Sequence, residues 1–122
     1  MNAAARRTPV WHVHRALDHI ATLRDHLARG LDFDDPLLQD AVAMQLASAI
    51  DALKSANSAG GGNVAEAFGG AWPKIVGMRN VLAHEYFGVN VEVLRATVAN
   101  ELGGLESTAR ELVAEWDEPA GD

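Results

Sequence analysis

The chain has 122 residues and a formal net charge of −7, from 17 acidic side chains against 10 lysines and arginines. That length suits one domain, and the acidic balance argues against broad, nonspecific binding to nucleic acid, although a small basic pocket acting on RNA is compatible with it. The absence of cysteine excludes disulfides, zinc–thiolate sites and thiol catalysis. No apolar run resembles a signal peptide or approaches the ~20 residues of a membrane span, so we expect a soluble, cytoplasmic protein.

A first helix is predicted over residues 10–28, where apolar side chains recur every three or four positions after Pro9. His12, His19 and His26 repeat along it at intervals of seven. Neighbours in that series lie about 10 Å apart along a helix, which is too far to share a metal ion. We therefore expect solvated or interface histidines and no metal site.

A second helix is predicted from Pro36 to about residue 56, with Asp35 as its N-cap and the proline in its first turn. Asp51 and Lys54 are three positions apart on this helix, which favours a surface ion pair. The inward side is predicted to hold Leu38, Val42, Leu46, Ala49 or Ile50, and Leu53.

Two further helices are predicted after a glycine-rich connection. One short helical turn is expected at 64–68, followed by a third helix over about 72–86. A fourth helix is expected over about 90–116, where a long apolar repeat is interrupted by Gly103-Gly104. The pattern therefore predicts an all-α, up-and-down four-helix bundle with room for one extra short helix.

We expect a single domain over 1–122 with flexible ends at 1–8 and 117–122. Apolar side chains that remain on outward helix faces, such as Val81, favour a homodimer.

Chemically useful side chains concentrate between Gly77 and Gly88, in an arginine, an amide, an imidazole and a phenol. The helix there is predicted to have an inward side with Ile75, Met78 and Leu82, and an outward strip with Gly77, Asn80 and His84. A glycine inside a helix costs about 1 kcal/mol relative to alanine, which suggests a close approach to the backbone. Arg79 and His84 lie about 140° apart around a helix, so either the helix ends near His84 or a second copy of the chain completes the site.

Each of these residues also has an ordinary explanation. A lone histidine on an outer helix face is usually just solvated, and Tyr86 could be an aromatic at the edge of the core. Arg79 could pair with Glu85 or with a distant carboxylate. On the residues alone, a plain helical interaction surface is therefore the simpler reading.

The stretch from Trp72 to Asn90 resembles the HepT-like family within the HEPN superfamily. The family's mark is an arginine, a polar residue beside it, a histidine five positions after the arginine and a tyrosine two beyond. In this chain those residues are Arg79, Asn80, His84 and Tyr86, and the flanking tryptophan and Phe-Gly-Val turn match as well. The resemblance extends more weakly over the second helix.

The resemblance implies a HEPN-like fold and a metal-independent endoribonuclease without a cofactor, acting as the toxin of a type VII-like toxin–antitoxin system. The implied partner is a minimal nucleotidyltransferase antitoxin that transfers AMP to Tyr86. The implied assembly is a homodimer whose two motifs meet in a cleft between protomers.

The resemblance also assigns roles. Arg79 and His84 are the expected catalytic residues, because a guanidinium fork suits phosphate oxygens and an imidazole titrates near neutrality. Asn80 is the expected supporting residue. An adenylate on Tyr86 would block RNA by its bulk and negative charge.

Two features depart from the family pattern. Where relatives tend to have Gly-Glu in the second helix this chain has Ile50-Asp51, so any supporting carboxylate is shorter. The glycines at 60–62 replace a more helical connection, and they make no phosphate-binding loop because no strand precedes them and no lysine follows. The alternative function is therefore a catalytically inactive helical binding module, or an AMP-acceptor partner of a nucleotidyltransferase.

Overall fold

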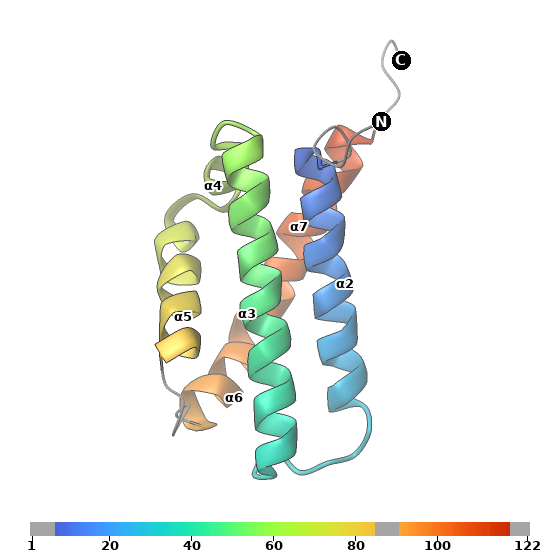
Figure 1. Cartoon of the computed structure of the whole chain (residues 1–122), viewed down its shortest axis with the longest axis vertical. Helices are drawn as coiled ribbons and strands as arrows, with labels where there is room; N and C mark the ends of the chain where they lie inside the picture. Colours follow the sequence, from blue (N-terminus) through green and yellow to red (C-terminus); the bar gives the residue numbers. More distant parts are fainter. Residues whose placement is uncertain (1–6, 85–90, 118–122) are drawn as a thin grey trace.

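A computed structural model describes residues 7–84 and 91–117, and for residues 83 and 84 only the backbone. In chain order its elements are α2 (Pro9–Leu27), α3 (Pro36–Ala59), α4 (Asn63–Phe68), the 3-10 turn η1 (Gly69–Ala71), α5 (Trp72–His84), α6 (Val91–Asn100) and α7 (Leu102–Trp116). Figure 1 shows α2, α3, α5 and the α6–α7 segment running along the same long axis in alternating directions. The predicted all-α, up-and-down bundle is confirmed, and α4 is the extra short helix.

The first two helices begin where side chains satisfy their free backbone N–H groups. The Thr8 hydroxyl accepts a hydrogen bond of 3.2 Å from the Trp11 amide at the start of α2. Asp35, the predicted N-cap of α3, accepts one of 2.9 Å from the Leu37 amide. Each cap contributes about 1 kcal/mol to helix stability. Both helices carry a proline in the first turn, where its missing N–H costs nothing.

The core lies between α2, α3, α4, α6 and α7. The predicted inward side of α3 is confirmed, since both Ala49 and Ile50 are buried along with the leucines and valine of that stripe. The helix α5 contributes only half-buried side chains to the cluster, and most of its contacts with other helices are to α3. It therefore lies at the edge of the bundle, where one side of it is available for chemistry.

The predicted fourth helix is divided into α6 and α7, and the break lies at Glu101 rather than at Gly103-Gly104. The position of the break is set by burial, because Leu102 is 1% exposed and begins α7 with its side chain in the core. Both glycines then fall in the first turn of α7, where backbone N–H groups lack intrahelical acceptors and a weak helix former is tolerated.

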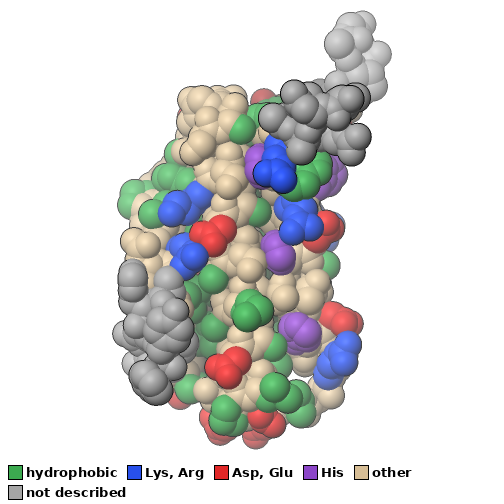
Figure 2. Space-filling model, viewed as in Figure 1, with side chains coloured by type: hydrophobic (Ala, Val, Ile, Leu, Met, Phe, Trp, Pro, Cys, Tyr) green, Lys and Arg blue, Asp and Glu red, His purple; other side chains and the backbone are tan. Residues whose placement is uncertain are grey.

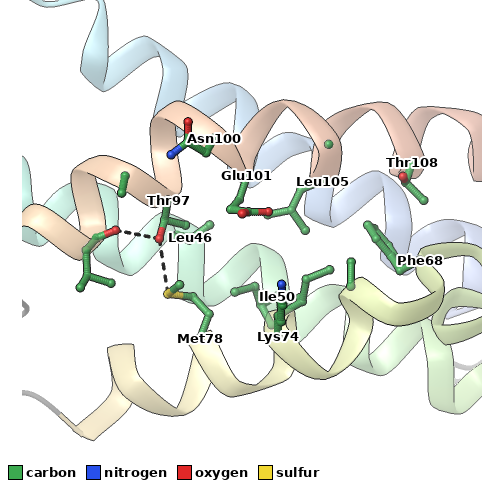
Figure 3. Close-up of a pocket in the computed structure, with 15 residues that line it drawn as sticks. Leu46, Ile50, Phe68, Lys74, Met78, Thr97, Asn100, Glu101, Leu105 and Thr108 are labelled. Atoms are coloured by element: carbon green, nitrogen blue, oxygen red, sulfur yellow. Dashed lines mark hydrogen bonds between the residues drawn. The ribbon is translucent and has the colours of Figure 1, made fainter.

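A groove separates α5 from α6 and α7. It has a volume of about 580 Å³, and Leu46 and Ile50 of α3 are among the side chains that line it. Figure 3 shows Met78 of α5 facing Thr97 of α6 across this space. The Thr97 hydroxyl lies 3.8 Å from the Met78 sulfur and donates a 2.8 Å hydrogen bond to the Val93 carbonyl.

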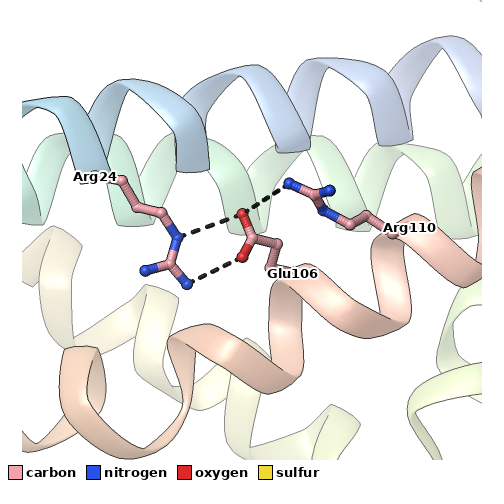
Figure 4. Close-up of polar contacts among 3 residues, drawn as sticks. All are labelled: Arg24, Glu106 and Arg110. Carbon is pink, nitrogen blue, oxygen red and sulfur yellow. Dashed lines mark hydrogen bonds and ion pairs between the residues drawn. The ribbon is translucent and has the colours of Figure 1, made fainter.

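An ion-pair network joins α2 to α7 on the other side of the bundle (Figure 4). Arg24 donates two hydrogen bonds to the Glu106 carboxylate, at 3.3 and 3.0 Å, and Arg110 adds a third at 3.4 Å. The hydrogen bonds from Arg24 are the main cause that lowers the pKa of Glu106 below its ordinary value. The Glu106 side chain is only 19% exposed, so it is partly shielded from solvent.

Thr8 and Asp117, which lie within the ends that are expected to be flexible, both make side-chain contacts. Besides the capping by Thr8, Asp117 lies 3.3 Å from the His14 imidazole. Residues 1–6 and 118–122 lie outside the described part of the chain. Across residues 7–84 and 91–117, none of the helices has the length and apolar character needed to cross a membrane.

Candidate active site

The two sides of α5 follow the predicted pattern. Ile75, Met78 and Leu82 are half-buried against the core, whereas Gly77 and Asn80 are exposed. Near the start of the helix, the Phe68 and Trp72 rings lie 5.8 Å apart and join α4 to α5. The outward strip therefore lies on α5, which packs against the rest of the protein on one side only.

Gly77 faces open space within the protomer. A Cβ atom built there would meet no atom within 4 Å. The close approach that its presence suggested is therefore absent from the described part of this chain.

Arg79 lies between α5 and α3, where it is joined to Asp51. Its Nε donates a 2.6 Å hydrogen bond to Oδ1 and its Nη2 a 3.0 Å bond to Oδ2, which is the fork geometry of a bidentate pair. The Arg79 side chain is 26% exposed and that of Asp51 is 49% exposed. The guanidinium thus has a fixed orientation at a surface that solvent can reach.

The Arg79–Asp51 ion pair contributes more to the orientation of the guanidinium than to the stability of the fold. A half-exposed ion pair is worth about 0.5–1 kcal/mol. The hydrogen bonding of Arg79 to the Asp51 carboxylate is the main cause that raises the pKa of Arg79, which favours the charged guanidinium. Two of its edges are used by the carboxylate, and Nη1 makes no hydrogen bond to any described residue.

The predicted surface pair of Asp51 with Lys54 is wrong. Asp51 reaches instead to Arg79, 28 positions further along the chain, because packing brings α5 against α3. The distant carboxylate considered as a partner for Arg79 is therefore present. Asp51 belongs to the Ile50-Asp51 departure from the family pattern, and both oxygens of its short side chain reach the arginine.

The remaining residues of the motif are described only in part. The side chain of Asn80 is exposed and forms no hydrogen bond with the described residues. His84 is the last residue of α5, but its side chain lies outside the described part of the chain, as does Tyr86. Along a helix, the Cα atoms of Arg79 and His84 are separated by about 7.5 Å of axial rise.

The histidines of α2 are engaged separately from one another. His19 lies 2.8 Å from the Gln45 side-chain oxygen of α3, and His14 is exposed beside Asp117. Within residues 7–84 and 91–117 there is no group of three or more histidine, aspartate or glutamate side chains that could hold a metal ion.

Comparison with known proteins gives two matches. A family model described as "Ribonuclease HepT-like" matches residues 13–112. A protein of Caldanaerobacter subterraneus subsp. tengcongensis, named "Putative RNase TTE0752", is 43% identical over 42 residues, which make up 34% of this chain and 38% of that protein. The chain thus spans well under half the length of this curated relative. No solved structure matches the chain at a significant level.

Proposed function

Because the chain belongs to the HepT-like ribonuclease family, we propose that it is an endoribonuclease that cuts RNA without a metal ion, through Arg79 and His84. The observation that carries the proposal is the fixed guanidinium of Arg79. Asp51 holds it at two N–H groups, and its remaining N–H groups can bind the oxygens of a phosphodiester. The all-α bundle agrees with the HEPN-like fold that the motif implies.

The proposed reaction needs only proton transfer and charge stabilisation from the protein. The 2′-hydroxyl oxygen attacks the adjacent phosphorus, and the P–O5′ bond breaks as the O2′–P bond forms. An imidazole accepts the 2′-hydroxyl proton, and the departing 5′ oxygen takes up a proton, which leaves a 2′,3′-cyclic phosphate and a 5′-hydroxyl end. Arg79 offsets the negative charge that develops on the phosphoryl oxygens.

A homodimer would place the required groups together. Arg79 points toward α3, and His84 follows about 140° further around the helix, so one protomer does not aim both at the same atom. Two copies of His84 in a shared cleft would supply both the base and the acid. Gly77, with open space in front of it, lets the second protomer or the RNA approach the α5 backbone. Asn80, exposed one turn before His84, is the supporting residue that would orient the imidazole or the phosphate.

Control of the nuclease is proposed to follow the family's scheme. The chain would be the cytoplasmic toxin of a toxin–antitoxin pair, and a minimal nucleotidyltransferase would inactivate it by transferring AMP to Tyr86. The phenol is two positions beyond His84, so an adenylate there would bring negative charge into a site for a phosphodiester.

One observation favours a second candidate function. The Arg79 charge is already neutralised by Asp51 within the protomer, as in an ordinary structural ion pair. A catalytically inactive module that serves only as an AMP acceptor would have the same pair. It would be modified at Tyr86, but the unmodified protein would not cut RNA.

Expression without a partner separates the two functions. Wild type and His84→Ala are produced from a tightly controlled promoter, and growth and total RNA integrity are scored together. The nuclease predicts growth arrest with RNA fragmentation for wild type and neither for His84→Ala at equal soluble protein levels. Intact RNA with the wild-type protein, or fragmentation by both proteins, would contradict it.

A further inference from the structure

A cluster of cations lies where α2 begins beside the C-terminal part of α3. The guanidinium groups of Arg7 and Arg15 lie 5.8 and 5.7 Å from the centre of the Trp11 ring, which is half-exposed. Such cation–π contacts restrict long side chains that would otherwise move freely. Figure 2 shows blue and purple side chains gathered on the upper part of this face, while red ones lie mainly at its lower end.

These cations lack the carboxylate partners that the other arginines have. Arg24, Arg29, Arg79, Arg95 and Arg110 each pair with an aspartate or glutamate. Within residues 7–84 and 91–117, Arg7, Arg15 and Lys54 form no ion pair, although acidic residues outnumber basic ones by 17 to 10 in the whole chain. An acidic protein that leaves these charges together and unpaired has a local site for an anion.

Two of these cations, Arg7 and Lys54, line a hollow together with polar side chains. The hollow, with a volume of about 530 Å³, is lined by Arg7, His12, Lys54, Ser55, Ser58 and Ala59. Both serine hydroxyls can donate hydrogen bonds, and the lysine and arginine supply charge, which are the groups that bind phosphate oxygens in proteins. We call this site the Lys54 hollow.

The Lys54 hollow is aligned with the candidate active site along α3. Asp51, Ser55 and Ser58 are spaced by four and three residues and therefore share one stripe of the helix. Ser55 follows Asp51 by about 6 Å of helical rise and Ser58 by about 10 Å, so the hollow begins about one turn from the carboxylate that holds Arg79 and extends to about two turns. A single RNA strand can therefore span from Arg79 to the hollow with phosphates about one or two nucleotides apart.

We propose that the Lys54 hollow is a second phosphate subsite, which binds the backbone of a single RNA strand about one or two nucleotides from the bond held at Arg79. The placement of the cut bond rests on the proposed nuclease function, whereas the binding of RNA in the hollow does not. The subsite would attract the RNA backbone locally, whereas the net charge of −7 makes the protein as a whole repel it.

The test measures binding without cleavage. A fluorescently labelled single-stranded RNA of twelve nucleotides is titrated with the full chain carrying His84→Ala, and anisotropy is recorded at several salt concentrations. Into that background go Lys54→Gln, Arg7→Gln and, as a matched control, Arg29→Gln. Each variant removes one positive charge, and Arg29 lies about 33 Å from Arg7 by helical rise, paired with Asp25.

The proposal predicts that Lys54→Gln and Arg7→Gln each weaken RNA binding by about tenfold at low salt, with Arg29→Gln within about twofold of the background. The slope of log affinity against log salt should fall by about 0.7 for each subsite variant. Equal affinities in all variants would overturn the proposal, as would an equal loss in Arg29→Gln or no RNA binding at all. Tighter Lys54-dependent binding of a polyglutamate peptide of equal charge would assign the hollow to an acidic protein and would also overturn it.

Cleavage assays with the His84-intact proteins separate the two claims. If Lys54-dependent binding is found but the wild type cuts no RNA, RNA binding in the Lys54 hollow is supported and the nuclease function is contradicted. If the wild type cuts RNA and Lys54→Gln leaves both KM and binding unchanged, the nuclease function is supported and RNA binding in the Lys54 hollow is contradicted. If both stand, Lys54→Gln should raise KM for the twelve-nucleotide RNA with kcat unchanged.

Discussion

Arg79 of α5 and Asp51 of α3 are joined by two hydrogen bonds, of 2.6 and 3.0 Å, across 28 positions of the chain. The contact fixes the direction of the one cation in the motif that cannot lose its proton. It also links α5, which is held at the edge of the bundle, to the most central helix. The proposed chemistry depends on this link.

Replacing Asp51 tests its role as a positioning residue. Asp51→Asn keeps the shape but loses the second acceptor oxygen and the charge, so the guanidinium is held less firmly. We expect kcat for RNA cleavage to fall about 10- to 100-fold, with a change in the free energy of unfolding below about 1 kcal/mol. Single-turnover cleavage and urea unfolding measure the two quantities.

Asp25→Asn is the matched control for this change, because Asp25 is paired with an exposed arginine at the end of α2 and touches no motif residue. Asp51→Glu should recover part of the lost activity, since the carboxylate is kept. Faster cleavage in Asp51→Asn would mean that the aspartate restrains the arginine from its substrate and would contradict the positioning role.

The Gly77→Ala variant distinguishes the stability of the chain from the approach of a second protomer or RNA to α5. The added methyl group meets no atom within the protomer, and alanine favours the helix by about 1 kcal/mol. We expect a more stable chain but weaker cleavage, because the methyl group would stand where a second protomer or RNA approaches. Gly103→Ala, also facing open space, is the control and should leave cleavage unchanged. Full cleavage activity in Gly77→Ala would show that no such approach occurs.

Tyr86 is the only tyrosine of the chain, so replacing it tests directly whether adenylation of this residue inhibits RNA cleavage. Incubation with the cognate nucleotidyltransferase and ATP should add AMP to the wild type and stop RNA cleavage. Tyr86→Phe should keep cleavage but show no added mass by intact mass spectrometry. Adenylation of Tyr86→Phe would place the acceptor elsewhere.

Acid stability should depend on Glu106. The pKa of this carboxyl is lowered in the folded state, chiefly by Arg24, so the stabilisation is present above the ordinary glutamate pKa and is lost as pH falls through the folded value. Glu106→Gln should lower the free energy of unfolding by about 1 kcal/mol at neutral pH and reduce its decline between about pH 5 and 3. Denaturant unfolding across that range measures both, and parallel curves for the two proteins would contradict the assignment.

Much of the fold could be predicted from local signals in the sequence. Asp35 followed by proline indicates a helix start, and the spacing of apolar residues identifies the inward side of α3, because both depend on neighbours in the chain. The break between α6 and α7 lies at Glu101, two residues before the position that the sequence pattern predicted. Glycine propensity indicated Gly103, whereas the burial of Leu102, which is a tertiary effect, determines where α7 begins.

The roles of the motif residues Arg79, Asn80, His84 and Tyr86 stay predictions, whereas helical spacing placed Asn80 outward correctly. The pairing of Asp51 with Arg79 could not be predicted, because it depends on the register of α3 against α5 and no local spacing reports that register. Lys54, three residues from Asp51, looked like the natural partner on one helix but forms no ion pair with the described residues.

Experiments with purified protein can test whether Arg79 and His84 cut RNA. Wild type, Arg79→Ala and His84→Ala, each shown to be folded by circular dichroism, are incubated with RNA in the presence of a metal chelator, and the product ends are identified. We predict cleavage by the wild type to 2′,3′-cyclic phosphate and 5′-hydroxyl ends, with a loss of at least about 100-fold in each variant. Cleavage by His84→Ala at the wild-type rate would contradict the account.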